Sequence, residues 1–308
     1  MKFLGYYPGV DFTDSSQFGR LIHTKKFLES YTSSIDDDSI FIVGRRGTYE
    51  HPNIMEIGFG QSYVSKVIRD IVGLFILFYH IIKTDEKIVI YCRDSPYISK
   101  LVVAGVSTVE VVVEVNGVSQ SEGDESSTRS RIYSWIRYWT RHFASLIIAV
   151  SSSIKSQLNE IHQSKNIFVV ENGVDTDLFS PSDTVTSSSD ITVCYVGGLQ
   201  EWQRVDLMLG VLAEMDDDVT FLVVGGTAER CAWLHREAKK RNLTENTEIV
   251  GRVEYEEVPN YINQSDVCFG PFNQEREASP MKIYEYLACA KPVILINDVG
   301  LEYVDEYP

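Results

Sequence analysis

The segment EREASPMKIYEYLACAKPVILI, Glu275 to Ile296, holds one complete helix-to-strand unit of the chain. Ser279 suits the N-cap of a helix and Pro280 its first position, so a helix is predicted over 280–289. The apolar run KPVILIN at 291–297 then predicts a strand. Glu277 precedes the helix, and Glu285 lies inside it among apolar neighbours. Helices that alternate with such strands are typical of parallel α/β sheets.

The same alternation runs through the whole chain of 308 residues. Short β-branched runs predict further strands at 1–7, 40–44, 87–92, 109–115, 146–151, 166–173, 191–198, 219–226, 247–253 and 266–272. Helical patterns lie between them at 17–31, 61–83, 97–105, 127–144, 152–161, 205–214, 230–241 and 258–264. The fold class is therefore α/β, with doubly wound, Rossmann-like parallel sheets.

A polar break, SPSDTVTSSSD at Ser180 to Asp190, divides this alternation. We expect a first domain at 1–180, a linker at 181–190 and a second domain at 191–308. Ligands of such sheets bind at the carboxyl ends of the strands, so we expect the two domains to face a common cleft. The second domain has fewer strands than the usual sheet of about six, which predicts an incomplete domain.

Composition and charge exclude several classes of protein. A formal net charge of −16 argues against a nucleic-acid-binding protein, which needs basic surfaces. The five cysteines are widely spaced in apolar runs, as expected of reduced thiols in the cytoplasm. The longest apolar run, IVGLFILFYHII at Ile71 to Ile82, is shorter than the roughly 20 residues of a membrane span. No transmembrane segment and no signal peptide are therefore expected.

Polar groups near the predicted helix at 280–289 suit an anionic ligand. The free N–H groups at Ser279 and the following positions favour a negative group, and Lys282 adds a point charge. Glu277 and Glu285 are suited to binding the hydroxyls of a sugar nucleotide. Alternatively, Glu277 is a solvated loop residue and Glu285 lies on the helix surface. The spacing of the residues alone does not decide between these two interpretations.

The second half of the chain resembles a known enzyme family. EASPMKIYEYLACAKPVI resembles the glutamate-seven-glutamate signature of the retaining glycosyltransferases of family 4, which have the GT-B fold. VENGVDTDLFSP (170–181), YVGGLQEWQRVDLML (195–209) and IVGRVEYEEVPNYINQSDVCFGPF (249–272) are similar to other segments of that family, in the same order. The N-terminal half resembles the family more loosely, through FGRLIHTKKFLES (18–30) and EVNG (114–117).

The resemblance implies a role for each matching residue. Glu277 would contact the donor sugar near the reacting carbon, and Glu285 would bind the ribose hydroxyls of UDP or GDP. Ser279, Met281 and Lys282 would complete the donor site. The sugar would be transferred with retention of configuration to a glycan or glycolipid acceptor, and neither a cofactor nor a metal would be needed.

The chain departs from the family pattern after the first strand of the second domain. The family usually has an Arg and a Lys there, where this chain has Gly198 and Gln203. Arg204 is adjacent and could replace them, or Lys282 could share their role. If neither cation reaches the diphosphate, donor binding would be weak, so a non-catalytic GT-B partner protein is one alternative. A nucleotide-sugar 2-epimerase of the same fold is another.

Candidates in the first domain lie near the ends of its predicted strands. Gly19 follows the first strand and could let backbone amides approach the donor, or it could be an ordinary turn residue. Arg93, Glu114 and Asn116 follow two apolar strands, where they could bind acceptor or donor or cap the loops. His23 is interpreted as a surface or core residue.

One predicted helix is basic in an otherwise acidic chain. TRSRIYSWIRYWTRHF, Thr128 to Phe143, contains four arginines and no acid. Its apolar residues fall on one stripe, with Arg137 and Arg141 opposite, at positions 132, 135, 136, 139 and 143. We expect this stripe to pack on the sheet. The alternative is that the helix docks on anionic lipid, which would place the enzyme at the cytoplasmic face of a membrane.

Overall fold

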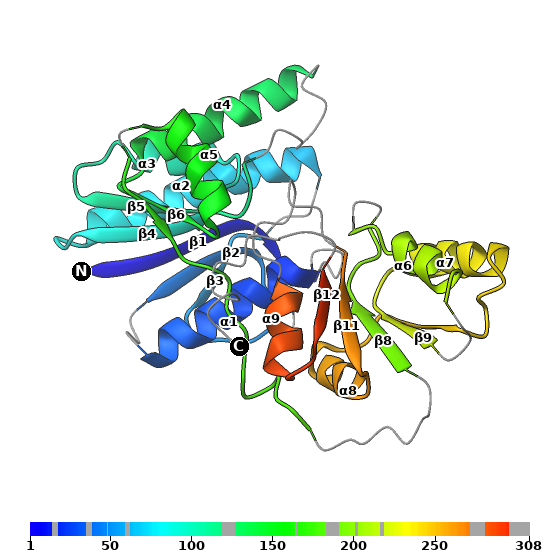
Figure 1. The fold of residues 1–308 in the computed structure, drawn as a ribbon. Coiled ribbons are helices and arrows are strands. Elements are labelled where there is room, and N and C mark those ends of the chain that lie inside the picture. The colour runs from blue at the N-terminus through cyan, green and yellow to red at the C-terminus, as the bar shows by residue number, and fades with distance from the viewer. Residues whose placement is uncertain are drawn as a thin grey trace. The chain divides into compact units, whose positions relative to one another are not determined.

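A computed structural model describes residues 1–13, 18–34, 39–47, 49–58, 62–118, 127–163, 165–182, 191–200, 203–215, 219–271 and 281–295. The chain divides into two compact units, Met1–Val170 and Glu171–Pro308. Each unit contains one β-sheet with helices packed on it (Figure 1). All strand pairs in both sheets are parallel.

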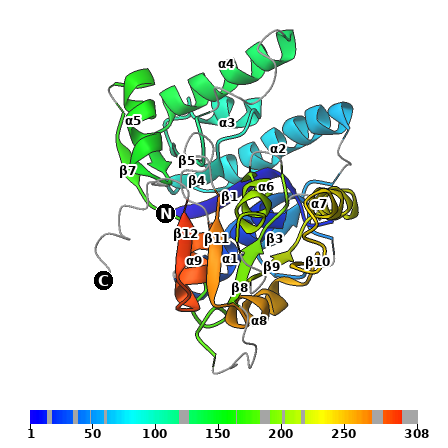
Figure 2. The ribbon, with the colours of Figure 1, turned by 45° about the vertical axis from the view of Figure 1, so that its right-hand side comes forward.

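The first unit contains a seven-stranded sheet with the order β3-β2-β1-β4-β5-β6-β7. Its strands are β1 (Lys2–Asp11), β2 (Ile40–Arg45), β3 (Ile54–Glu56), β4 (Ile88–Arg93), β5 (Val109–Val115), β6 (Leu146–Ala149) and β7 (Ile167–Val169). Its helices are α1 (Phe18–Ser34), α2 (Tyr63–Lys83), α3 (Ile98–Val103), α4 (Thr128–Phe143) and α5 (Ser152–Ile161). Figures 1 and 2 show α1 on one face of the sheet and α2 to α5 on the other.

Aromatic side chains fill the space between α1 and the sheet. The Phe3 and Tyr31 rings stack with centroids 4.0 Å apart, and the Phe27 and Tyr91 rings do so at 4.7 Å. Phe41 is fully buried beside them. This packing positions α1 against the strands and brings its first turns toward their carboxyl ends.

The second unit contains a five-stranded sheet with the order β10-β9-β8-β11-β12. Its strands are β8 (Ile191–Val196), β9 (Val219–Val224), β10 (Thr247–Gly251), β11 (Val267–Gly270) and β12 (Val293–Leu295). Its helices are α6 (Asp206–Leu212), α7 (Ala228–Lys240), the short 3₁₀ helix η3 (Tyr255–Glu257), α8 (Val258–Asn263) and α9 (Met281–Ala288). Its core is built around buried aromatic residues of the strands, Tyr195, Phe221 and Phe269.

The structure confirms the predicted fold class of two doubly wound parallel sheets. Each predicted strand and helix corresponds to an observed one, and the sequence pattern missed only β3 among the described strands. β3 has three residues, too few for a period to be recognised.

The second compact unit begins at Glu171, ten residues before the predicted linker. Phe179 is fully buried, and its ring centroid lies 5.3 Å from that of Tyr255. The Asn263 amide donates to the carbonyl of Ser180 over 3.0 Å. Residues 171–182 therefore pack with η3 and α8 of the second unit, and positions 183–190 of the predicted linker at 181–190 lie outside the described residues.

No helix in the described part of the chain is both long and apolar enough to cross a membrane.

Candidate functional site

Two glycine-rich loops meet at the carboxyl ends of β8 and β9. Gly225 has φ +111°, and a Cβ atom there would lie 2.2 Å from the carbonyl oxygen of Gly197. The N–H of Gly197 donates to the carbonyl of Val224 over 2.9 Å. Only glycine permits this contact between the backbones, because any side chain at 225 would collide with the neighbouring loop. Glycine-rich loops at the carboxyl ends of strands bind phosphates in other Rossmann-like sheets.

Helix α9 places a lysine at the first of these loops. Tyr286 is fully buried, and its hydroxyl accepts a hydrogen bond of 2.8 Å from the N–H of Val196, which fixes α9 against β8. Lys282, in the first turn of α9, lies with its Nζ 5.4 Å from the centre of the Tyr195 ring. A Cβ atom on Gly197 would lie 3.1 Å from that Nζ. Lys282 can therefore reach an anion that binds over Gly197.

Glu285 lies in the same helix as Lys282, and the structure buries it. It is 6% exposed, and its Oε1 accepts a hydrogen bond of 2.9 Å from the Tyr255 hydroxyl. Burial raises the pKa of Glu285, while the Tyr255 hydrogen bond and the Lys282 charge oppose that rise. The alternative interpretation, that Glu285 lies on the helix surface, is thus wrong, because α9 turns this side chain inward toward η3.

The loop that departs from the family pattern is closed by Gln203. This side chain is 5% exposed, and its Oε1 accepts a hydrogen bond of 3.0 Å from the N–H of Gln200. A Cβ atom on Gly198 would make only ordinary contacts, at 3.8 Å or more, so no close approach requires glycine there. Arg204 is half exposed and lies 3.6 Å from Asp206. Of the two candidate cations, Lys282 is therefore the one that lies against Gly197.

Four further residues were predicted to belong to the donor site. Met281 is the first described residue of α9 and is partly buried. Glu277 and Ser279 lie outside the described residues. Gly19 lies in the exposed first turn of α1, where a Cβ atom would meet nothing within 4 Å. The position therefore has no steric need for glycine.

The acceptor-side candidates of the first unit form one cluster around Glu114, at the end of β5. The Tyr91 hydroxyl donates to Oε2 over 2.7 Å, and the Asn116 amide donates to Oε1. Arg93 Nε lies 3.3 Å from Oε1, and His23 Nε2 lies 3.7 Å from it. The sequence thus identified three members of this cluster. It missed Tyr91, and it interpreted His23 as a surface or core residue outside the site.

Electrostatics keeps Glu114 charged despite its burial. Burial favours the neutral acid, but Arg93, His23 and the two hydrogen bonds outweigh it and lower the pKa of Glu114 below its ordinary value. An ionised carboxylate with four polar neighbours fixes the orientation of Arg93 and His23, which are each partly exposed. Such a cluster at the carboxyl edge of a parallel sheet is suited to binding hydroxyl-rich ligands.

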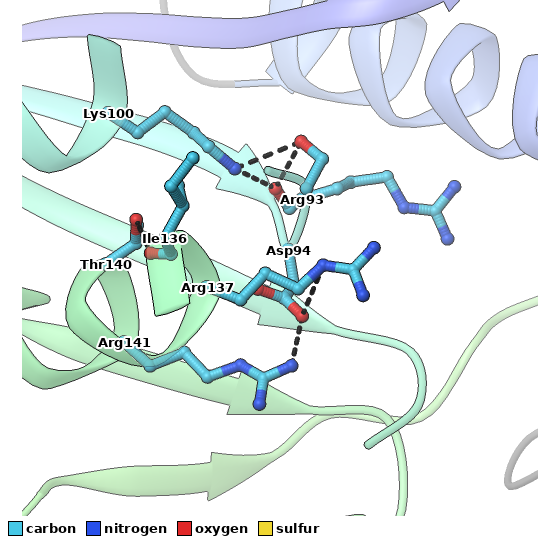
Figure 3. A network of polar contacts seen from close by, with 8 residues as sticks. Arg93, Asp94, Lys100, Ile136, Arg137, Thr140 and Arg141 are labelled. Atoms are coloured by element: carbon cyan, nitrogen blue, oxygen red, sulfur yellow. Dashed lines mark hydrogen bonds and ion pairs between the residues drawn. The ribbon is translucent and has the colours of Figure 1, made fainter. Parts of the chain in front are cut away.

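The basic helix α4 is oriented differently from the prediction. Arg141 pairs with Asp94, and Arg137 Nε lies 4.0 Å from the same carboxylate (Figure 3). The expectation that the apolar stripe packs on the sheet is wrong for Ile132, Trp135 and Phe143, which are 52%, 54% and 50% exposed. Asp94 directly follows β4 and attracts the arginines, so the helix turns its aromatic residues outward.

No group of three or more residues that could hold a metal ion occurs within the described segments.

The residues that sequence reasoning missed are mostly tyrosines, namely Tyr91, Tyr195 and Tyr255. Tyr91 and Tyr195 lie in strands, where an aromatic residue is an ordinary choice for packing, and Tyr255 is the first residue of η3. Only the tertiary contacts of their hydroxyl groups and rings mark them out.

Comparisons with known proteins agree with this arrangement. Residues 180–304 match the family model for glycosyl transferases group 1, and residues 70–178 match that for glycosyltransferase family 4. The chain is 29% identical over 143 residues to TuaH of Bacillus subtilis (strain 168), described as a teichuronic acid biosynthesis glycosyltransferase. That match covers 43% of this chain and 35% of TuaH, so the chain spans about a third of that relative.

Solved structures share the fold at low sequence identity. Sucrose-phosphate synthase from Thermosynechococcus elongatus superposes with a TM-score of 0.76 at 15% identity, over 96% of this chain and 81% of that one. Anabaena HepE in complex with UDP gives 0.71 at 15% identity, over 99% and 83%. Because the two family models together match residues of both units, the chain belongs to the group 1 glycosyltransferases, which have the GT-B fold.

Proposed function

We propose that the chain is a retaining glycosyltransferase that moves a sugar from a nucleotide-diphosphate sugar to a glycan or lipid-linked acceptor. The observation that carries the proposal is the placement of Lys282 against Gly197, in the loop after β8, with Glu285 buried in the same helix. A cation and glycine-rich loops suit the diphosphate of a nucleotide, and a carboxylate suits its ribose hydroxyls. These residues fall within the segment that matches the group 1 family.

Each residue has a proposed role in binding the donor. Lys282 binds the diphosphate and stabilises the charge that grows on it as the sugar leaves. Glu285 accepts hydrogen bonds from the ribose hydroxyls, and the Tyr255 hydroxyl holds its carboxylate in place. Glu277 lies near the reacting carbon, and Met281, Ser279 and Gly198 complete the donor site. No metal takes part, because protein cations neutralise the diphosphate.

The chemical step joins the acceptor oxygen to the anomeric carbon as the bond from that carbon to the diphosphate oxygen breaks. The acceptor attacks from the face that the diphosphate leaves, so the configuration is retained. The acceptor proton passes to the departing diphosphate. The protein therefore positions both substrates and stabilises charge, and it needs no nucleophile of its own.

Related proteins indicate the classes of donor and acceptor. HepE was solved with UDP and also with UDP-glucose, which favours a UDP-sugar over a GDP-sugar. TuaH is described as a teichuronic acid biosynthesis glycosyltransferase, which favours a glycan acceptor. In the first unit, Arg93, Glu114 and Asn116 are the proposed acceptor-side residues. We place the enzyme in the cytoplasm, in peripheral contact with a membrane through α4 at Thr128–Phe143.

Calorimetric titration with UDP and with GDP, without added metal, tests this function. We expect UDP to bind, and Glu285→Ala to weaken binding about tenfold or more. Glu229→Ala, an exposed acid at the start of α7, is the matched control and should bind as the unchanged chain does. A folded chain that binds neither nucleotide would contradict the proposal. A chain that converts the sugar of its donor without an acceptor would instead be an epimerase.

A further inference from the structure

Helix α2 exposes an apolar row along its whole length. Val64, Val67, Ile71, Phe75, Tyr79 and Ile82 are between 43% and 81% exposed. The opposite row is buried on the sheet and includes Arg69, Leu77 and His80. A surface helix of a soluble protein normally carries charged residues where α2 carries Phe75 and Ile82. An apolar row of this length marks an interaction surface.

Two neighbouring helices extend this surface. Helix α3 packs against both α2 and α4, and all three cover the same face of the seven-stranded sheet (Figures 1 and 2). On each helix the residues opposite the buried row point away from the sheet. We call this surface the three-helix face and define it by the exposed apolar row of α2 with Ile98, Val102, Ile132, Trp135, Tyr138 and Phe143.

The charge of these helices is opposite to that of the chain. The chain has a formal net charge of −16, yet α2, α3 and α4 together contain eight lysines and arginines and one acid, Asp70. The Asp70 carboxylate accepts hydrogen bonds from the N–H groups of Ile98 and Ser99, over 2.7 and 2.9 Å. It is thus engaged at the start of α3.

Only half of these cations face outward. Lys66, Lys83, Arg129 and Arg131 are exposed. Arg141 and Arg137 contact Asp94, and Lys100 is fully buried and donates to the carbonyl of Arg93 over 2.9 Å (Figure 3). The exposed cations thus lie on α2 and α4, two of the three helices that carry the exposed apolar residues.

We propose that the three-helix face docks on an anionic phospholipid bilayer, with α2 lying in the plane of the interface. Aliphatic and aromatic side chains that flank lysines and arginines are the chemistry of such helices. Phe75, Tyr79 and Trp135 would enter the boundary between headgroups and acyl chains, and the exposed cations would bind anionic headgroups.

A second copy of the chain fits the three-helix face less well. A two-fold interface places the same surface on itself, so Lys66, Lys83 and Arg131 would meet the same cations of the other copy. An anionic bilayer instead supplies the opposite charge over the whole surface. The docking proposal rests on the proposed function only in its purpose, which is to bring the enzyme to a lipid-linked acceptor.

Vesicle flotation tests the proposal with the full chain. Vesicles of phosphatidylglycerol mixed with phosphatidylcholine should bind the protein at low salt, and vesicles of phosphatidylcholine alone should bind it weakly. Phe75→Ser combined with Ile82→Ser should reduce binding about tenfold or more, because two exposed apolar side chains are lost. Lys66→Glu combined with Lys83→Glu should reduce binding to anionic vesicles by a similar factor.

Matched controls use the second unit. Val211 is 51% exposed in α6, and Lys239 is exposed in α7, so Val211→Ser and Lys239→Glu should leave vesicle binding unchanged. Circular dichroism and UDP titration of every variant separate a loss of docking from a loss of folding or of the donor site. Equal binding by the α2 variants and the controls would overturn the proposal. So would a dimer in solution that Phe75→Ser dissociates.

Discussion

The hydroxyl of Tyr255 donates a hydrogen bond of 2.9 Å to Oε1 of Glu285, joining η3 to α9 across thirty residues of sequence. Both side chains are buried, and burial raises the pKa of both. Ionising the buried carboxyl group of Glu285 costs free energy, and the hydrogen bond from Tyr255 offsets part of that cost.

Tyr255→Phe should therefore destabilise the protein in a pH-dependent way. Because the folded pKa of Glu285 lies above its ordinary value, stability falls as pH rises through the window between the two. Removing the Tyr255 donor raises the folded pKa further and widens this window. We expect a loss of about 1–2 kcal/mol in unfolding free energy at pH 8 and a smaller loss at pH 4.5. Urea titrations at both pH values measure the loss of unfolding free energy.

Tyr261→Phe in α8 is the control for Tyr255→Phe. An equal loss for Tyr255→Phe at both pH values would refute the role of Glu285.

Lys282 and Arg204 should contribute unequally to nucleotide binding. Lys282 lies against Gly197, whereas Arg204 is half exposed and lies beside Asp206. We expect Lys282→Met to weaken UDP binding about tenfold or more, and Arg204→Met to weaken it about threefold or less. Calorimetry at two salt concentrations measures both effects. A larger loss from Arg204→Met would mean that the loop after β8 supplies the diphosphate cation.

Glu114→Gln should destabilise the first unit far more than a matched change on the same strand. Glu114 is buried among Arg93, His23, Tyr91 and Asn116, while Glu110 forms an exposed pair with Lys87. We expect losses of about 2–3 kcal/mol for Glu114→Gln and about 0.5 kcal/mol or less for Glu110→Gln. Because the folded pKa of Glu114 is lowered, its contribution is present at neutral pH and is lost as pH falls through that pKa. Chemical unfolding at pH 7 and pH 4 checks both statements, and similar losses for the two variants would contradict them.

His162 should make the protein less stable under mild acid. Its ring is buried between α4 and α5, and burial together with Arg141, His142 and Lys165 lowers its pKa from 6.5 to about 4, against the opposing effect of Asp94. The unfolded chain therefore binds this proton first, and stability falls as pH decreases from 6.5 toward 4.

His162→Gln should remove part of that dependence, about 1 kcal/mol between pH 7 and pH 5. Thermal unfolding at the two pH values measures it. His235→Gln, at an exposed position of α7, is the control. The same pH dependence in wild type and His162→Gln would exclude His162 as its source.

The sequence by itself determined the elements and the family. Periods of two and 3.6 residues are local properties, so the eleven predicted strands and the helices between them could be placed without the fold. The motif around Glu285 and the glycines after β8 also lie in continuous segments. These local patterns were sufficient to identify the GT-B architecture and to predict a donor site containing Lys282.

The tertiary structure decided which face of each element is buried and which polar groups meet. Helix α4 turns Arg137 and Arg141 toward Asp94 and Trp135 outward, although its apolar stripe predicted the reverse. The row on α2 is exposed because the opposite row of the same helix, which includes Arg69, Leu77 and His80, is the one that is buried on the sheet. Tyr255 and His23 acquire their partners through contacts with distant segments. Such pairings depend on how helices rotate when they pack, and no local period carries that information.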